Sequence, residues 1–279
     1  MSVAAVSVME ETTARPFAKW AGGKRQLLPE LHRRLPERFG RYHEPFVGGG
    51  AMLFSRAWAA GATVADTNEE LVVAYEQVQK DVEGVIRELR GHTFTTEHYY
   101  AVRALDPGTL TPNERAARTI YLNRTCFNGL YRVNRAGRFN VPIGRYANPT
   151  ICDAANLRAC SRHLERTLIF RADFAETMAC AEPDDFMFLD PPYVPVSKTS
   201  SFTAYGAEGF NETEQRALAE CFAHASSRGV HLMLTNSDTP LVRELYADFR
   251  IDEVRATRAI NSKSSKRGKV SELVVRNYG

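Results

Sequence analysis

Residues 41–66 read RYHEPFVGGGAMLFSRAWAAGATVAD, a strand pattern, an apolar helix pattern and a second strand pattern in succession. The segment RYHEPF is expected to form a short strand that runs into the glycine-rich turn at 48–50. The apolar residues 51–60 would follow as a helix, and residues 63–65 as a short strand that ends on Asp66. A strand, a helix and a second strand in this order predict a doubly wound α/β fold with a mostly parallel sheet.

The same alternation returns in the last part of the chain. The strand at 186–189 is uniformly apolar (FMFL) and ends in Asp190-Pro191-Pro192-Tyr193. The other expected elements are strands at 167–170 and 230–234, a helix at 213–228, and a closing hairpin formed by residues 251–260 and 272–278. These elements complete the sheet that begins with residues 41–66.

A segment of different character separates these two α/β regions. Residues 68–90 carry apolar side chains at helical spacing, which predicts one long amphipathic helix. A helix at 114–124 leads into TCFNGLYRVNRAGRFNVPIGRY (125–146), which is rich in Gly, Asn and Arg, as in turns and short hairpins. We divide the chain into a flexible tail (1–14), a first α/β half (15–69), an inserted, mostly helical domain (70–163) and a second α/β half (164–279).

The composition excludes several classes of protein. The 279 residues are 44% hydrophobic and 25% charged, as in globular proteins of about two domains. No apolar run reaches the roughly 20 residues of a transmembrane helix, and the first residues lack the order of a secretion signal. The cysteines form no CxxC pair and the histidines show no HExxH spacing, so neither a disulfide framework nor a metal site is predicted. A cytoplasmic protein with reduced thiols is the expectation.

Positive charge is concentrated in the insert. Residues 111–164 hold nine arginines against two acidic residues, although the net charge of the chain is only +3. A second basic stretch, 263–269, contains Lys266 and Arg267. Such clusters indicate contact with a polyanion, and a solvated basic face is the alternative.

The glycine-rich turn and Asp66 together favour a cofactor that contains a nucleoside. Glycines between a strand and a helix let the backbone approach a ligand closely, next to the free N–H groups of the helix start. The spacing matches neither GxGxxG nor a P-loop, so a phosphate cradle is not indicated. Asp66 ends the next strand, where a carboxylate can bind the two hydroxyls of a ribose. A tight turn without any ligand is the alternative.

The sequence Asp190-Pro191-Pro192-Tyr193 is the sharpest chemical signal. The prolines end the strand and fix a rigid turn, which presents Asp190 at the carboxyl edge of the sheet. A carboxylate and a neighbouring backbone carbonyl can accept the two hydrogens of an exocyclic amino group. Tyr193 offers a flat face on which a base can stack, worth roughly 1–3 kcal/mol. The alternative, a proline turn with a solvated acid, is disfavoured by the apolar strand before it.

Five motifs together resemble the Dam-type, alpha-class DNA adenine-N6 methyltransferases. They are FAKWAGGK (17–24), EPFVGGGAM (44–52), YLNRTCFNGLYRVN (121–134), GRFNVPIGRY (137–146) and FLDPPY (188–193). The resemblance runs from about Phe17 to Tyr278, in the order cofactor half, target-recognition insert, catalytic half. It implies a Rossmann-like methyltransferase fold and methyl transfer from S-adenosylmethionine to adenine in double-stranded DNA, without a metal.

The resemblance also implies roles for the residues that match its motifs. Asp190 and a carbonyl of the proline turn, at Pro191, would bind the amino group of an adenine that has left the base stack, and Tyr193 would stack on that adenine. The residues matching the cofactor site are Trp20, Lys24, Phe46, Gly48, Gly50, Asp66, Asp173, Phe174 and Asp190. Because the amino nitrogen is a poor nucleophile, holding it in line with the methyl group would supply the catalysis, with no covalent intermediate.

The insert would then contact the duplex. Phe127 matches an aromatic residue that wedges into the duplex, with Asn128 beside it, and a core aromatic is the generic alternative. Lys19 would contact a guanine, and Leu130, Arg132 and Pro142 would read the outer bases of GATC. Phosphate contacts would come from Arg145, Arg124, Lys266 and Arg267; the alternative for many of the arginines is that they neutralise phosphates without reading bases. Two departures, Phe127 for a common tyrosine and Gly48-Gly49-Gly50 for Gly-Ala-Gly, leave the chemistry intact.

Three other functions remain open at this point. An amino methyltransferase acting on another DNA target, on cytosine or on RNA is the nearest rival, and Asp190 favours DNA adenine. A DNA-binding relative without catalysis is disfavoured by the intact Asp190, Tyr193, Trp20 and Lys24. A nicotinamide oxidoreductase is disfavoured by the glycine spacing. A monomer without an obligate protein partner suffices for one target strand, in the cytoplasm of a bacterium or a phage-infected cell.

Overall fold

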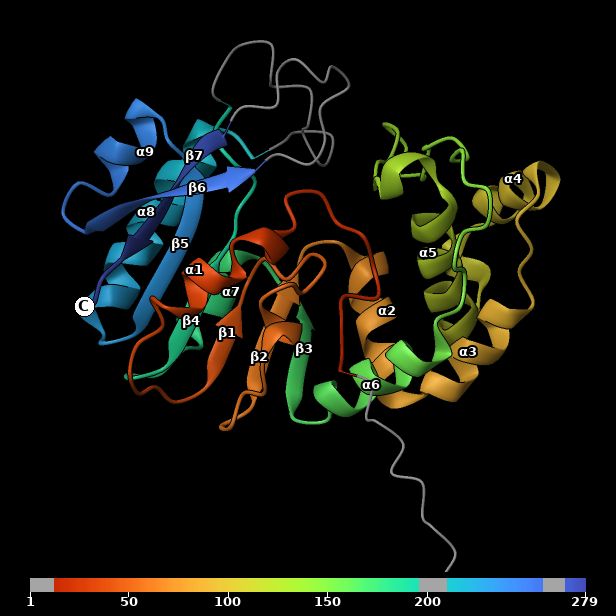
Figure 1. The fold of residues 1–279 in the computed structure, drawn as a ribbon, viewed down its shortest axis with the longest axis horizontal. Coiled ribbons are helices and arrows are strands. Elements are labelled where there is room, and N and C mark those ends of the chain that lie inside the picture. The colour runs from red at the N-terminus through yellow and green to blue at the C-terminus, as the bar shows by residue number, and fades with distance from the viewer. Residues whose placement is uncertain (1–12, 196–209, 258–268) are drawn as a thin grey trace, which may run out of the picture.

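The computed structural model describes residues 13–195, 210–257 and 269–279, and these form a seven-stranded sheet flanked by helices (Figure 1). The strand order is β3-β2-β1-β4-β5-β7-β6, in which β1 to β5 run parallel and β7 runs antiparallel to both β5 and β6. The strands are β1 (Tyr42–Glu44), β2 (Ala62–Asp66), β3 (Thr167–Arg171), β4 (Phe186–Leu189), β5 (His231–Ser237), β6 (Arg250–Thr257) and β7 (Lys269–Arg276). The predicted α/β class, with its mostly parallel sheet and closing hairpin, is confirmed.

The order of the strands determines where a ligand can bind. The chain starts in the middle of the sheet at β1, continues outward through β2 and β3, and returns to the other side of β1 with β4. The connections therefore diverge between β1 and β4, and a crevice opens at the carboxyl ends of strands at such a switch point. Glu44 ends β1 and Leu189 ends β4, so the glycine-rich turn and Asp190 both leave the sheet at this point.

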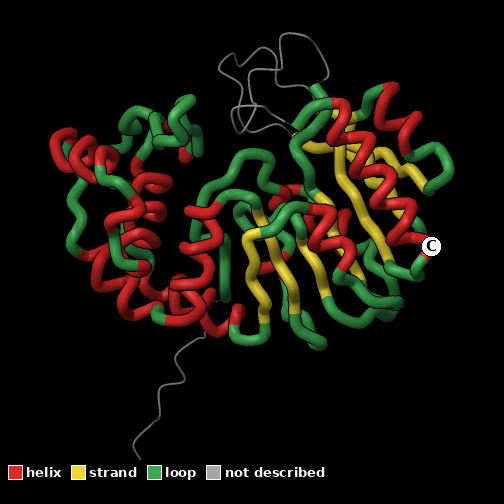
Figure 2. Tube along the Cα trace, turned by 180° about the vertical axis from the view of Figure 1, so that it is seen from behind, coloured by secondary structure: helices red, strands yellow, loops and turns green. Residues whose placement is uncertain are grey.

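Alternate side chains of the strands enter two hydrophobic clusters, one on each face of the sheet. On β4, Phe186 and Phe188 join one cluster, whereas Met187 and Leu189 join the other. Helices α7 (Phe174–Ala179), α8 (Glu212–Ser227) and α9 (Pro240–Leu245) cover the face of Met187, which Figure 2 views from the front. Helices α1 (Leu28–His32), α2 (Glu69–Lys80) and α6 (Ala154–Leu164) cover the other face.

A group of helices lies beyond β3 at one end of the molecule (Figure 1). It consists of α3 (Val82–Arg90), α4 (Thr96–Ala104) and α5 (Pro112–Thr125), with α5 packed against α2, α3 and α4. Tyr99 and Tyr121 of these helices belong to the same buried cluster as Val64 and Phe186 of the sheet. Because α2 contacts both the sheet and α5, the hydrophobic core is continuous from the sheet into the helices.

Two expected helices differ from the structure for identifiable reasons. The single helix expected at 68–90 is interrupted at Asp81, whose side chain accepts a hydrogen bond from the Gly84 N–H and caps α3. Of the helix expected at 51–60, only a 3₁₀ turn at Leu53–Ser55 forms. The backbone groups of Leu53 form hydrogen bonds with side chains instead of with the backbone of a helix. Its N–H donates to Glu44, and its carbonyl accepts from Trp58.

Candidate functional site

Asp190 lies directly after β4 and is held between two donors. The Lys24 Nζ is 2.8 Å from Asp190 Oδ1, and the Thr235 hydroxyl donates to the same oxygen at 2.9 Å. The Lys24 side chain is only 6% exposed and the Asp190 side chain 19%. Burial raises the pKa of Asp190, and Lys24 and Thr235 oppose that rise. The Lys24 ammonium also lies 4.5 Å from the centre of the Tyr193 ring, which brings these three expected residues together.

The Asp190–Tyr193 turn is braced by side chains that the sequence did not indicate. Gln215 donates from Nε2 to the Pro192 carbonyl at 2.8 Å, and Asn236 accepts from the Val194 N–H at 3.0 Å. The Tyr193 hydroxyl donates to Glu272 at 2.8 Å. Pro191 is buried, and among the described residues no hydrogen bond to its carbonyl is found. The turn is therefore rigid. The Pro192 carbonyl is occupied by Gln215, and the Pro191 carbonyl is available to a ligand.

A second buried carboxyl group, Glu44, lies at the end of β1. Its Oε2 accepts hydrogen bonds from the Tyr42 hydroxyl at 2.7 Å and from the Leu53 N–H at 3.1 Å. Burial raises the pKa of Glu44 to about 8, and the charge of Asp190 adds to the rise. Glu44 therefore holds its proton more tightly than an ordinary glutamic acid, within the field of an Asp190 that is paired with Lys24.

The glycine-rich turn and Asp66 are joined by a hydrogen bond. Gly48 has a φ of 46° and its N–H donates to Asp66 Oδ2 at 3.1 Å, while the Asn68 N–H donates to Oδ1 at 2.9 Å. A Cβ on Gly50, which has a φ of 69°, would lie 2.6 Å from the Tyr75 hydroxyl. The turn therefore needs glycine at both positions. Each Asp66 oxygen keeps one lone pair, which suits the two hydroxyls of a ribose.

Three aromatic rings gather beside this turn. Phe46 stacks on Phe174 with ring centroids 5.7 Å apart, and Phe210 meets both rings edge-on. Such flat apolar faces fit the adenine of a nucleoside cofactor. Asp173, which precedes Phe174, caps α7 by accepting from the Glu176 N–H at 2.9 Å. The residues expected for the cofactor site thus fit an adenosine-containing group.

The segment after α5 forms an irregular hairpin, which we call the recognition hairpin (residues 126–146). Isolated antiparallel bridges join Cys126 to Ile143 and Val133 to Phe139. The Phe127 N–H donates to the Pro142 carbonyl at 2.9 Å. The side chains expected to contact DNA are exposed along this hairpin: Phe127, Asn128, Leu130, Arg132, Pro142 and Arg145.

Phe127 is not the core aromatic of the generic alternative, since 46% of its surface is exposed. Asn128 beside it has a φ of 55°, which turns the chain sharply. The Arg132 Nε donates to the Asn140 side chain at 2.7 Å, so a neighbour on the opposite strand of the hairpin orients this guanidinium. Arg124 is half-buried on α5, where burial lowers its pKa, and Lys266 and Arg267 lie outside the described residues.

Lys19 is fixed against the recognition hairpin by Asn123. The Asn123 side chain accepts from the Lys19 N–H and donates to the Lys19 carbonyl, both at 2.7 Å. Gly129 has a φ of 64°, and a Cβ on it would lie 2.5 Å from Lys19 Cδ. The Lys19 ammonium is 4.7 Å from the centre of the Tyr146 ring. Lys19 therefore belongs to the surface of the hairpin, although the two are far apart in sequence.

Trp20 lies between the glycine-rich turn and the recognition hairpin. Its indole stacks on the Tyr131 ring with centroids 5.4 Å apart and an interplanar angle of 27°. On the other side, a Cβ on Gly48 would lie 2.7 Å from Trp20 Cδ1. Tyr131 lies within the motif at 121–134, but the sequence assigned it no role, because its contact with Trp20 forms only in the folded chain.

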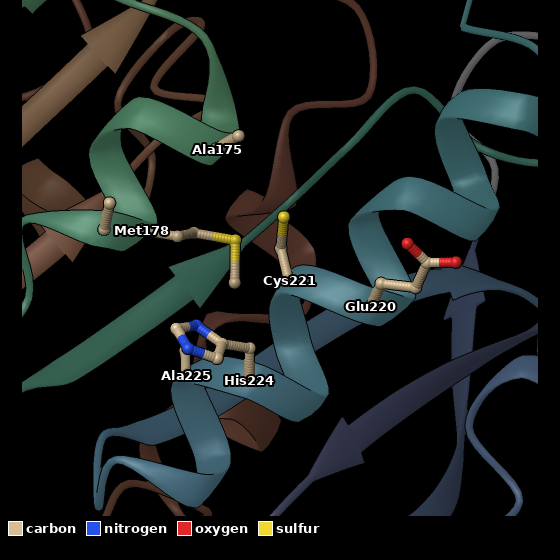
Figure 3. A pocket seen from close by; sticks show the side chains of 7 residues that line it. Ala175, Met178, Glu220, Cys221, His224 and Ala225 are labelled. Carbon is tan, nitrogen blue, oxygen red and sulfur yellow. The ribbon is translucent and has the colours of Figure 1, made fainter.

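A cavity of about 240 Å³ lies elsewhere, between α7 and α8. Met178 and Cys221 lie across from one another on the two helices and line it together with His224 (Figure 3). None of the residues expected to act lines this cavity. No group of three or more metal-ligating side chains occurs in the described residues, and no helix among them is long and apolar enough to span a membrane.

Comparison with known proteins extends over both α/β regions and the helices between them. The family model described as D12 class N6 adenine-specific DNA methyltransferase matches residues 20–260. The type II methyltransferase M1.LlaDCHI of Lactococcus lactis subsp. cremoris is 44% identical, in a match that covers 95% of this chain and 96% of that protein. M.MjaIII of Methanocaldococcus jannaschii is 40% identical over 95% and 99% of the two chains. A DNA adenine methylase of Haemophilus influenzae is 33% identical over 93% and 92%.

Proposed function

The chain belongs to the D12 class of N6 adenine-specific DNA methyltransferases, and on this premise we propose that it methylates adenine within GATC after flipping that base out of the duplex. S-adenosylmethionine, the cofactor that the family implies, supplies the methyl group when bound. The remaining steps of the proposal concern what the side chains of this protein do.

The pair formed by Lys24 and Asp190 is the observation that carries the proposal. A cationic N–H donor lies 2.8 Å from Asp190 and 4.5 Å from the Tyr193 ring centre, where an adenine amino group would meet the same carboxylate and ring. In this proposal Lys24 moves aside as the base enters. Asp190 and the Pro191 carbonyl then accept the two amino hydrogens, because the Pro192 carbonyl is bonded to Gln215.

These two acceptors prepare the amino nitrogen of adenine to act as the nucleophile. Its lone pair is delocalised into the adenine ring, and accepting both hydrogens draws the nitrogen towards tetrahedral geometry. The braced turn fixes the two acceptors in advance, and such positioning can supply about 7–11 kcal/mol in favourable cases. Tyr193, anchored through its hydroxyl on Glu272, provides the stacking face.

The proposed cofactor site consists of the glycine-rich turn, Asp66 and the aromatic group of Phe46 and Phe174. Asp66 binds the ribose hydroxyls with the lone pairs left by Gly48 and Asn68. The remaining residues proposed to line this site are Trp20, Lys24, Gly50, Asp173 and Asp190. The site lies at the switch point between β1 and β4, where ligands of open α/β sheets bind.

The recognition hairpin is proposed to read the duplex. Flipping the base out of the duplex costs a few kcal/mol of lost stacking. The exposed Phe127 fills the space that the base leaves, and this contact offsets part of the cost. Arg132 pairs with a guanine, with Leu130 and Pro142 beside it, and Lys19 contacts the other guanine. Arg124, Asn128, Arg145, Lys266 and Arg267 complete the proposed contacts. We infer a cytoplasmic monomer that acts on double-stranded DNA.

Plasmid digestion tests the proposal directly. Plasmid lacking adenine methylation is incubated with protein and S-adenosylmethionine, then cut with one nuclease that requires methylated GATC and one that requires unmethylated GATC. A switch in cutting is the expected result. Labelled methyl groups that enter DNA without a switch would contradict GATC alone, and label that enters only RNA, or nothing, would contradict the DNA reaction.

A further inference from the structure

Tyr131 has no part in the chemistry or the base reading proposed above, yet it connects the recognition hairpin, to which it belongs, with the proposed cofactor site. Its neighbours Leu130 and Arg132 are exposed on the recognition hairpin, whereas Tyr131 itself turns inward. Its ring stacks on Trp20 at 5.4 Å, and the nearby Asn68 side chain acts on its hydroxyl, which partly offsets the effect of burial on the pKa of Tyr131. Burial raises the pKa of Tyr131, which stays a neutral phenol.

Both contacts of Tyr131 lead to Asp66. Trp20 packs on the backbone of Gly48, whose N–H donates to one Asp66 oxygen. The Asn68 N–H donates to the other oxygen, while the Asn68 side chain caps α2 through the Leu71 N–H. A shift of the hairpin would therefore displace both groups that orient the carboxylate proposed for the ribose.

We propose that Tyr131 is a positioning residue that couples binding of target DNA to binding of the cofactor. The inference rests on the proposed function, because it requires both ligands. DNA that orders the recognition hairpin presses Tyr131 onto Trp20 and Asn68 and so completes the cofactor site. Linkage makes the effect reciprocal: the factor by which DNA tightens the cofactor equals the factor by which the cofactor tightens DNA.

Two variants divide the contacts of Tyr131. Tyr131→Phe keeps the stack on Trp20 and removes the hydroxyl that lies near Asn68. Tyr131→Ala removes both. The control is Tyr100→Ala, since Tyr100 is an exposed tyrosine of α4 that packs on Arg103 and Tyr99, away from Trp20. Circular dichroism and thermal unfolding establish that each variant is folded.

The measurement is calorimetric, with S-adenosylhomocysteine and a short duplex that contains GATC as the two probes. The Kd of each probe is determined alone and with the other probe saturating, which gives two coupling ratios. For the unaltered protein we expect equal ratios of about 5-fold or more. Tyr131→Ala should bring both ratios to within about twofold of one, Tyr131→Phe should give an intermediate value, and Tyr100→Ala should change neither.

Each other outcome overturns the proposal in a recognisable way. Full coupling in Tyr131→Ala would assign the communication to other residues. Equal weakening of S-adenosylhomocysteine with and without DNA would make Tyr131 a plain wall of the cofactor site. If the unaltered protein binds neither probe, the proposed function is contradicted, and the inference fails with it.

Discussion

Asp190 combines a half-buried carboxylate with two donors, Lys24 and Thr235, on one oxygen. We expect Asp190→Asn to reduce methyl transfer by at least about 100-fold, because the neutral amide is a weaker acceptor than the carboxylate and can present a donor where the target amino group needs an acceptor. Duplex binding should survive, since the recognition hairpin is untouched. Label transfer from S-adenosylmethionine and a gel-shift measurement give the two quantities.

A matched control for this variant is Asp238→Asn, in which the lost charge is paired with the exposed Arg243. It should retain full activity. Turnover by Asp190→Asn close to that of Asp238→Asn would remove Asp190 from the mechanism.

Glu44 predicts a dependence of stability on pH. Its pKa is about 8 in the folded protein against an ordinary value of 4.5, so the folded state binds the proton more tightly. This contribution to the free energy of unfolding is complete below about pH 4.5 and declines as the pH rises towards 8, by at most about 1.4 kcal/mol per pH unit. Glu44→Gln should remove that decline, as measured by urea unfolding at several pH values.

The exposed Glu220 of α8 offers the comparison. Glu220→Gln should give a curve parallel to that of the unaltered protein. A Glu44→Gln curve that is also parallel would show that Glu44 is ionised in the folded state.

Arg132 is expected to discriminate one base. Removing it as Arg132→Ala should cost about 1–3 kcal/mol on GATC and much less on a duplex in which the guanine it reads is replaced. Arg135, which is exposed on the same hairpin, serves as the reference. Arg135→Ala should weaken all duplexes alike, and a uniform loss for Arg132→Ala would reassign Arg132 to phosphate.

At the scale of single residues, the sequence predicted the groups with distinctive chemistry and missed their supports. Asp190, Tyr193 and Lys24 belong to recognisable motifs, and the structure brings them together. Gln215 and Glu272 brace the turn from α8 and β7, where they read as ordinary helix and strand residues. Only the folded chain brings them next to the turn, so spacing along the sequence carried no signal.

At the scale of elements, Gly129 joins the conformation of the recognition hairpin to the position of Lys19. Gly129 combines a φ of 64° with contact to the Lys19 stem, whereas Gly137, with a φ of 72°, has no atom within 4 Å of an added Cβ. Gly129→Ala and Gly137→Ala should therefore share a strain of about 1 kcal/mol or more in thermal unfolding. Only Gly129→Ala should also displace Lys19 and raise the KM for duplex.

Equal KM values for the two variants would show that Lys19 adapts without cost or does not touch DNA. Strain common to both cancels in this comparison, because each glycine has a left-handed backbone.

Helices and strands were predicted correctly where residues close in sequence determine them, and wrongly where contacts between distant residues do. The apolar strand β4 was predicted at its observed bounds, because four consecutive buried residues have few other solutions. The helix expected at 51–60 was wrong, since the groups that interrupt it, Glu44 and Trp58, act through tertiary contacts. Asp81 breaks the long helix although the apolar spacing continues across it.

For the molecule as a whole, the continuous core predicts cooperative unfolding. Side chains of the helices around α5 and of the sheet belong to one buried cluster, with α2 in contact with both. We expect one calorimetric transition with equal calorimetric and van't Hoff enthalpies. Two separable transitions would show that the insert melts as an independent unit.

The position of β7 has a consequence for synthesis on the ribosome. β7 is the last strand of the chain, yet it lies between β5 and β6 and supplies Glu272 to Tyr193. Until residues 269–276 leave the exit tunnel, β5 has an open edge and β6 has no partner in the sheet. A growing chain contains the glycine-rich turn and Asp190 before it contains β7, so its stacking tyrosine is anchored only after β7 has been synthesised. We expect a chain that is terminated before residue 269 to be inactive, because Tyr193 lacks its hydrogen bond to Glu272. We also expect proteases to degrade it, because the unpaired edge of β5 is exposed.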